Sequence, residues 1–169
     1  EEVSGRDERS SAGIRSRRFG FVFQFFHLLP ELTVLENVAL PLWIRDRGRS
    51  DPRHRAEASR LLREFHLEHR ENAPPTRLSG GELQRAAICR SIVSAPGVIF
   101  GDEPTGSIDA ATARILFDVM LRLNRERGTT FIVATHNEKF LQIATKVVYL
   151  ENGAVRKIEP RESPAPTTP

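Results

Sequence analysis

Short apolar segments alternate along this chain with longer segments whose apolar residues recur at helical spacing. Three of the short segments read as buried strands, namely 19–23 (FGFVF), Val98–Gly101 and Phe131–Thr135. The segments between them carry apolar residues three and four positions apart, as the buried faces of helices do. Short strands that alternate with helices predict an α/β fold with a mostly parallel sheet.

Capping signals predict where the helices begin. Ser79 and Glu82 stand three apart, in the form of a capping box, before an apolar-periodic run to Ile92. Asp51-Pro52 places an N-cap aspartate before a first-turn proline, and Asp109 can cap a further helix that Gly128 can end. The helix expected after Thr33 is predicted to stop where Pro41 intrudes.

The two ends of the chain read differently from its middle. Residues 1–18 are expected to be a flexible or partly ordered lead-in, and 159–169 a disordered tail rich in Pro, Ser and Thr. A short helix is expected over 138–144. Asn152-Gly153 then predicts a hairpin that adds an antiparallel edge to the sheet. Because the chain begins with Glu1 and its only methionine is Met120, we expect it to be cut from a longer protein.

Composition narrows the possible functions. The 169 residues fit one domain, and 25 basic against 22 acidic residues give a net charge of +3, which argues against nucleic acid as a partner. No stretch approaches the roughly 20 apolar residues of a membrane-spanning helix. A role at a membrane would therefore need a partner that crosses it. A lone cysteine, Cys89, excludes an intrachain disulfide, is expected to be buried, and fits a cytosolic setting.

Two acids end the predicted strand at 98–101. Asp102 and Glu103 would stand at the carboxyl edge of the sheet, where ligands bind in open α/β folds. Asp102 there can hold Mg²⁺ directly or through water, and Glu103 can polarise an attacking water. The alternative is a strand that ends in a solvated acidic turn.

Three further sites have the same kind of chemistry. Ser79, Gly80 and Gly81 offer a hydroxyl and close backbone access at a helix N-terminus, which is suited to an anion. Gln24 and His136 each follow a predicted strand, where an amide and an imidazole can reach a metal, a water or a phosphate. Taken singly, each has a plain structural reading, as a capped helix or a loop residue.

In chain order, the sequence reads Gln24, LSGGE (78–82), VIFGDEPTGSID (98–109) and Thr135-His136. Over roughly 19–158 it resembles the nucleotide-binding subunit of ABC transporters, with Q-loop, signature motif, Walker B, D-loop and switch histidine. FQFFHLLP (23–30) and TVLENV (33–38) are closest to the lipoprotein-releasing (Lol-type) and macrolide-export (MacB-like) subfamily. Glu82 stands where the signature often has glutamine.

The resemblance implies a P-loop-type ABC ATPase domain, here partial and covering 19–158, with a helical subdomain at about 30–95. It also implies ATP and Mg²⁺ as cofactors, a homodimer, an integral membrane permease as partner, and a peripheral place on the cytoplasmic face of the cell membrane. The roles it implies are catalysis by Glu103 and His136, metal binding by Asp102 and Gln24, γ-phosphate contact by Ser79, Gly80 and Gly81, and a dimer contact by Asp109.

One expected motif does not occur in these residues. No G-x-x-x-x-G-K-[ST] stands anywhere in 1–169, so the first strand and the Walker A segment of the family are missing from this sequence. We therefore expect this chain alone to bind ATP poorly and to be inactive. Two alternatives stay open, a non-catalytic module that keeps only the signature half-site and a soluble ABC-type ATPase outside transport.

Overall fold

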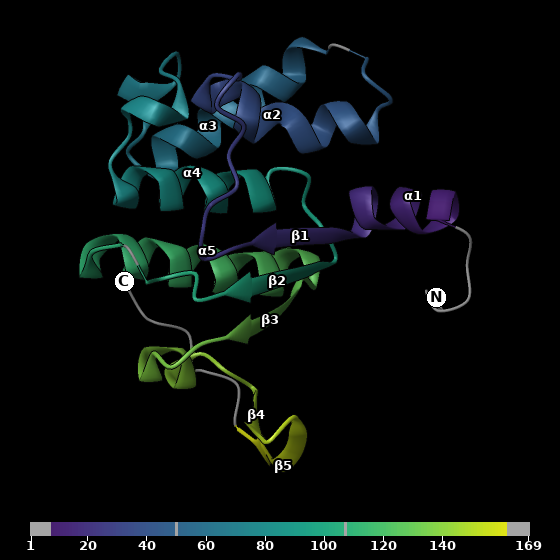
Figure 1. Cartoon of the computed structure of the whole chain (residues 1–169), viewed down its shortest axis with the longest axis vertical. Helices are drawn as coiled ribbons and strands as arrows, with labels where there is room; N and C mark the ends of the chain where they lie inside the picture. The colour runs from purple at the N-terminus through teal and green to yellow at the C-terminus, as the bar shows by residue number, and fades with distance from the viewer. Residues whose placement is uncertain (1–7, 50, 107, 162–169) are drawn as a thin grey trace. The chain divides into compact units, whose positions relative to one another are not determined.

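The computed structural model describes residues 8–49, 51–106 and 108–161. The chain divides into two compact units, Glu1–Ala134 and Thr135–Pro169, and each is described by itself. Figure 1 shows the elements of both units.

The first unit is built on a three-stranded sheet in the order β1-β2-β3. The strands β1 (Phe19–Val22), β2 (Val98–Asp102) and β3 (Thr130–Ala134) all run parallel. Their register aligns Phe21 with Phe100 and Phe100 with Ile132. Strands far apart in sequence and joined through helices confirm the predicted α/β class with a mostly parallel sheet.

The strands are buried on one face only, which corrects the expectation of fully buried strands at 19–23 and 131–135. Val22 and Ile99 are buried, α4 packs against β1, and α5 packs against β3. In the alternate positions, Phe21 is 36% exposed and Ile132 is 52% exposed. A continuous apolar run shows that both faces of a strand can be covered, but it does not show what covers each face.

Three helices between β1 and β2 make the largest apolar core. They are α2 (Val34–Arg45), α3 (Pro52–Glu64) and α4 (Gly80–Ile92), which pack against one another. Two 3₁₀ turns, Glu68–Arg70 and Pro75–Arg77, join α3 to α4. The fully buried side chains of this three-helix core include those of Val34, Val38, Leu62, Phe65 and Ile88. That residues at about 30–95 form a separate helical subdomain stays a prediction.

The predicted caps are confirmed. Ser79 caps α4 with a complete capping box, Asp51 caps α3, and Asp109 caps α5 (Ala110–Arg127). Gly128 ends α5 in the left-handed region at φ 67°, which favours glycine. Cys89 is buried, as expected, and burial raises the pKa of its thiol.

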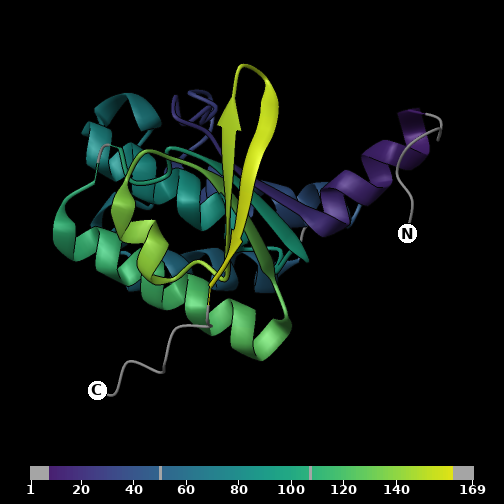
Figure 2. The same cartoon turned by 90° about the horizontal axis from the view of Figure 1, so that it is seen from below.

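Two helix predictions are corrected. α2 does not stop at Pro41 but continues to Arg45. Proline inside a helix costs about 3 kcal/mol, and the capping box at Thr33 together with the buried apolar face of α2 offsets that cost. Within the expected lead-in 1–18, residues Glu8–Arg18 form α1, which leads directly into β1 (Figure 2). Residues 1–7 lie outside the described part of the chain.

The second unit holds a 3₁₀ helix at Glu138–Gln142 and the hairpin of β4 (Lys146–Glu151) and β5 (Ala154–Pro160). Asn152 and Gly153 have φ of 50° and 77°, as the predicted tight turn requires. β4 and β5 form a sheet of their own, so the expected antiparallel edge on the main sheet is wrong. β5 also takes in residues 159 and 160 of the expected tail, whereas 162–169 lie outside the described residues.

Among the described residues, no helix combines the length and the apolar character that crossing a bilayer requires.

Candidate functional site

The sheet brings two predicted site residues to the same edge. Val22 pairs with Gly101, so Gln24, two residues beyond Val22, and Asp102, one beyond Gly101, both stand at the carboxyl ends of neighbouring parallel strands. Both side chains are exposed. Asp102 also borders a shallow hollow of about 160 Å³, lined mostly by apolar side chains of the exposed sheet face.

Glu103 turns the chain away from the sheet. Its φ of 45° is left-handed, which is uncommon for a residue with a side chain. Its backbone N–H donates to the Ala134 carbonyl at 2.9 Å, so pairing with the third strand continues one residue past β2. Glu103 therefore stands in a sharp turn at the carboxyl edge of the sheet, the edge at which the sequence predicted it.

The turn after Glu103 is fixed from α4 by a residue that sequence reasoning missed. Gln84 is 1% exposed and donates from Nε2 to the carbonyl oxygen of Pro104 at 3.1 Å. Gln84 stands one helical turn before buried Ile88, so a polar residue on the apolar stripe was the signal that could have found it. Because a buried amide needs a partner, this bond ties α4 to the Glu103 turn.

At the start of α4, both polar donors of Ser79 take part in the capping box with Glu82. The Ser79 hydroxyl and backbone N–H both donate to Oε2 of Glu82, at 2.9 and 2.8 Å. The Ser79 backbone N–H is the largest cause, followed by the Arg70 guanidinium and the Ser79 hydroxyl, and together they lower the pKa of Glu82 to about 2. Ser79 and Gly80 are exposed and Gly81 is half-buried. The first N–H groups of a helix have no acceptor within it, so this end of α4 is suited to an anion.

Asp109 serves as the N-cap of α5. It accepts from the Thr112 backbone N–H at 3.0 Å and from the Thr112 hydroxyl at 2.7 Å. The backbone donor of Thr112 is the main cause that lowers the pKa of Asp109. Arg85 of α4 lies 3.9 Å from the same carboxylate. The predicted dimer contact at Asp109 is thus a surface carboxylate with a capping role of its own.

His136 lies in the second unit, two residues beyond the end of β3. Its side chain is exposed. The Asn137 backbone N–H donates to Oγ1 of Thr135 at 3.0 Å, which fixes the chain on either side of the histidine. The structure therefore places Gln24, Asp102, Glu103 and the start of α4 in one unit and His136 in the other.

The donor set suits a magnesium ion that is shared with a nucleotide. No cluster of three or more His, Cys, Asp or Glu side chains that could hold a metal occurs among residues 8–49, 51–106 and 108–161. Mg²⁺ in proteins is commonly bound by one or two side-chain oxygens together with substrate phosphates and water. Asp102 and Gln24 fit that pattern.

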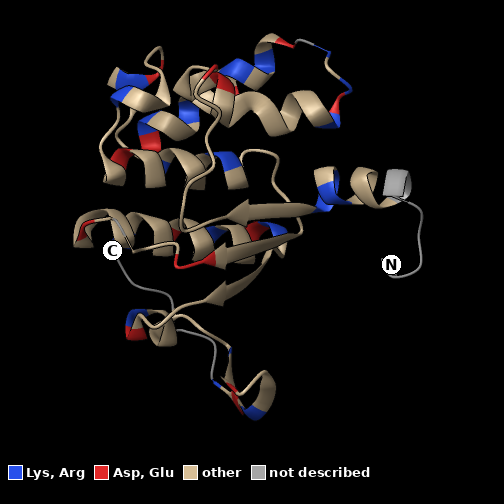
Figure 3. Cartoon of the chain, in the orientation of Figure 1, with Lys and Arg blue, Asp and Glu red and all other residues tan. Residues whose placement is uncertain are grey.

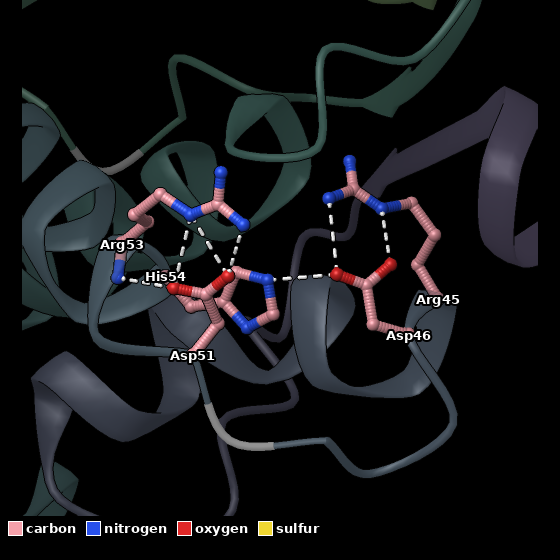
Figure 4. A network of polar contacts seen from close by, with 5 residues as sticks. All are labelled: Arg45, Asp46, Asp51, Arg53 and His54. Atoms are coloured by element: carbon pink, nitrogen blue, oxygen red, sulfur yellow. Dashed lines mark hydrogen bonds and ion pairs between the residues drawn. The ribbon is translucent and has the colours of Figure 1, made fainter.

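A second polar cluster joins the end of α2 to the start of α3 (Figure 4). His54 is buried, and its Nε2 lies 2.8 Å from Oδ2 of Asp46, which also accepts from Arg45. Arg53 donates to Asp51 and lowers the pKa of that carboxyl to about 2. These residues border a pocket of about 350 Å³. Sequence reasoning did not find this cluster, in which the His54–Asp46 contact links the two helices.

Charge over the helices is mixed. Figure 3 shows basic and acidic residues interspersed along α2, α3 and α4. Many form ion pairs, such as Arg60 with Glu57 and Arg122 with Glu64.

Comparison with solved structures defines the class of this fold. A dimeric structure of MJ0796, described as a bacterial ABC transporter cassette, matches with a TM-score of 0.86 and 38% identity, covering 92% of this chain and 68% of that one. A dimeric post-hydrolysis state of the same cassette, bound to ADP and Pi, matches with a TM-score of 0.86 and 37% identity, with the same coverage. The fold is that of an ABC ATPase cassette.

Sequence comparison gives the family. The model of the ABC transporter family matches residues 2–106. The lipoprotein-releasing system ATP-binding protein LolD of Bordetella pertussis is 42% identical over 154 residues, which cover 91% of this chain and 66% of that protein. LolD of Idiomarina loihiensis is 46% identical over 143 residues, covering 85% and 62%. This chain belongs to the ABC transporter family, and it spans about two thirds of the length of these curated relatives.

Proposed function

We propose that this chain is the greater part of an ATP-hydrolysing subunit that powers an ABC transporter. The observation that carries the proposal is the shared sheet edge, where Gln24 follows β1, Asp102 ends the neighbouring parallel strand β2, and Glu103 comes next in a sharp turn. Asp102 and Gln24 would hold Mg²⁺, which draws charge from the transferred phosphoryl group. Glu103 would accept a proton from the attacking water.

Ser79, Gly80 and Gly81 would contact the γ-phosphate of ATP bound mainly by a second copy of the chain. Support comes from the exposed capped N-terminus of α4 and from the dimeric arrangement of the similar MJ0796 cassette. His136 would stabilise the same phosphate in the transition state, and Asp109 would lie in the dimer contact. Each copy would thus complete the site of the other.

The membrane partner would be an integral permease, with this subunit on the cytoplasmic face of the cell membrane. We propose lipoprotein release as the transport process, because the curated relatives carry that name. Depletion of the natural gene product should then retain lipoproteins in the cell membrane. Unchanged lipoprotein sorting with altered macrolide sensitivity would instead favour a macrolide-type exporter.

The catalytic proposal is tested on the complete natural gene product. Glu103→Gln should lower Mg²⁺-dependent phosphate release by at least about 100-fold, because the general base is lost, while ATP binding persists. Glu126→Gln, an exposed glutamate on α5, is the matched control. Turnover of Glu103→Gln within about twofold of wild type would refute the catalytic role. Absence of hydrolysis in the wild-type protein would favour a non-catalytic half-site module.

A further inference from the structure

The segment between β1 and α2, residues 23–33, contains Gln24 and is held by two anchors. Asn37 of α2 is fully buried, accepts from the Leu29 backbone N–H at 2.7 Å and donates to the carbonyls of Leu29, Leu32 and Thr33. That anchor is local in sequence. The other comes from Arg90, 63 and 64 residues along the chain.

Arg90 lies in the last turn of α4 and its guanidinium donates to two successive carbonyl oxygens. Nη2 donates to the Phe26 carbonyl at 2.7 Å, and Nη1 donates to the His27 carbonyl. These acceptors stand two and three residues after Gln24. Both acceptors are neutral carbonyl groups, so these two hydrogen bonds fix the backbone conformation at Phe26 and His27 and do not form an ion pair. Burial lowers the pKa of Arg90.

The backbone that Arg90 contacts is in an uncommon conformation, although Phe26 N–H also donates to the Phe23 carbonyl and His27 N–H to the Phe25 carbonyl. Phe26 and His27 have φ of 58° and 50°, two consecutive left-handed residues that are not glycine. Such residues persist where surrounding contacts over-determine them. The planar guanidinium fork, with two donors directed to two successive carbonyls, supplies such a contact.

The end of α4 that bears Arg90 is also pressed against β1. A Cβ added at Gly20 would come within 2.3 Å of the Ser91 carbonyl oxygen, so strand and helix are in direct backbone contact there. The opposite end of α4 begins at Gly80, about 15 Å away at 1.5 Å per residue. One rigid helix therefore joins Ser79 and the glycines to the strand and segment that carry Gln24.

We propose that Arg90 is a positioning residue that fixes the segment after Gln24 to α4, so that Gln24 and the Ser79-Gly80-Gly81 end of the helix move as one body. The hold of Arg90 on this segment depends only on contacts within this chain. The consequence for catalysis, through the placing of Gln24, rests on the proposed function. Arg90 acts through the Phe26 and His27 carbonyls, which place Gln24.

The structural part is tested by hydrogen exchange and the catalytic part by kinetics, both on the complete natural gene product. Arg90→Gln should speed amide exchange in the peptide covering residues 24–29 and leave that of α2 unchanged. Its kcat should fall by roughly tenfold with KM for MgATP changed less than about twofold, because Gln24 would be misplaced in the transition state. Arg90→Lys, which keeps the charge but loses the fork, should lie between wild type and Arg90→Gln in both readouts.

Arg122→Gln is the matched control, because Arg122 also joins two helices, but its partner is the Glu64 carboxylate and not the backbone of residues 23–33. It should change neither readout. Unaltered exchange over 24–29 in Arg90→Gln overturns the structural part of the proposal, and lost protection with an unchanged kcat overturns its catalytic part. If Arg90→Gln does not fold, Arg90→Lys decides by the same criteria. A wild-type protein without ATPase activity would refute the proposed function, whereas the exchange result would still decide whether Arg90 holds the segment.

Discussion

Arg70 donates from its Nε to Oε1 of Glu82 over 2.8 Å, which places a positive charge beside the carboxylate in the first turn of α4. His69 lies 3.5 Å from the same oxygen. A glutamate this close to the proposed phosphate contact would repel a nucleotide there if its charge were left unbalanced. The pair therefore explains how a signature motif with Glu82 remains suited to an anion.

Arg70→Gln should raise the MgATP concentration for half-maximal hydrolysis by the natural gene product roughly fivefold, about 1 kcal/mol of exposed-pair electrostatics. In a Glu82→Gln background, the same change should have little effect, because no charge remains to be offset. The measurement is a double-mutant cycle on that concentration, with Arg60→Gln on the surface of α3 as control. Equal effects in both backgrounds would show that Arg70 acts on the fold and not on the charge of Glu82.

Glu82 also makes stability depend on pH. Its pKa in the folded chain is about 2, below its ordinary value of 4.5. A lowered carboxyl pKa stabilises the fold fully above about 4.5, and this stabilisation is lost as pH falls toward about 2. Glu82→Gln should therefore be less stable than wild type near pH 7 and lose less on acidification. Urea unfolding at several pH values from 7 to 2 checks this, and parallel profiles for the two proteins would contradict it.

The structure could be predicted from the sequence wherever a local signal, such as a helix cap, determined it. Ser79, Asp51 and Asp109 are caps whose side chains need only the next three backbone groups, and all three helices start where these residues predict. Strand identity followed in the same way from short apolar runs. The order of Gln24, Asp102 and Glu103 along an α/β pattern was enough to expect a shared sheet edge.

Features set by distant contacts were not predictable from the sequence. Pro41 should end a helix locally, but the packing of α2 on α3 and α4 decides otherwise. Arg90 looks like any helix-end arginine until its two carbonyl partners are known. The exposed face of Phe21 and Ile132 reads in sequence as part of a buried strand, because apolar character does not report which face is covered.

Gly20 is expected to tolerate no side chain. Gly20→Ala would bring a Cβ to 2.3 Å from the Ser91 carbonyl oxygen, so β1 or α4 must shift at a cost of about 1–3 kcal/mol in the free energy of unfolding. Gly13→Ala in α1 is the matched control, since nothing lies within 4 Å and alanine favours a helix by about 0.5–1 kcal/mol. Chemical denaturation of both variants gives the comparison. Equal stabilities would disprove the close contact of strand and helix.

Gln84→Leu keeps the volume at a buried position but leaves the Pro104 carbonyl without its donor. We expect a loss of about 1–3 kcal/mol in the free energy of unfolding, the usual cost of an unsatisfied buried acceptor. In the natural gene product, phosphate release should also fall, because the Glu103 turn loses its tie to α4. Gln142→Leu, at an exposed position, is the control. Full stability of Gln84→Leu would mean that Pro104 finds another donor.

The 169-residue chain by itself should hydrolyse ATP negligibly. Its residues contain Asp102, Glu103 and the capped start of α4 but no G-x-x-x-x-G-K-[ST] loop, and that loop with its lysine supplies the main grip on the β- and γ-phosphates. Phosphate release from the purified chain, with Glu103→Gln as the blank, measures this. Turnover of roughly 1 per second that disappears in Glu103→Gln would show that the chain grips phosphate by other means. Negligible turnover from this chain, beside an active natural gene product, would place the phosphate grip outside these residues.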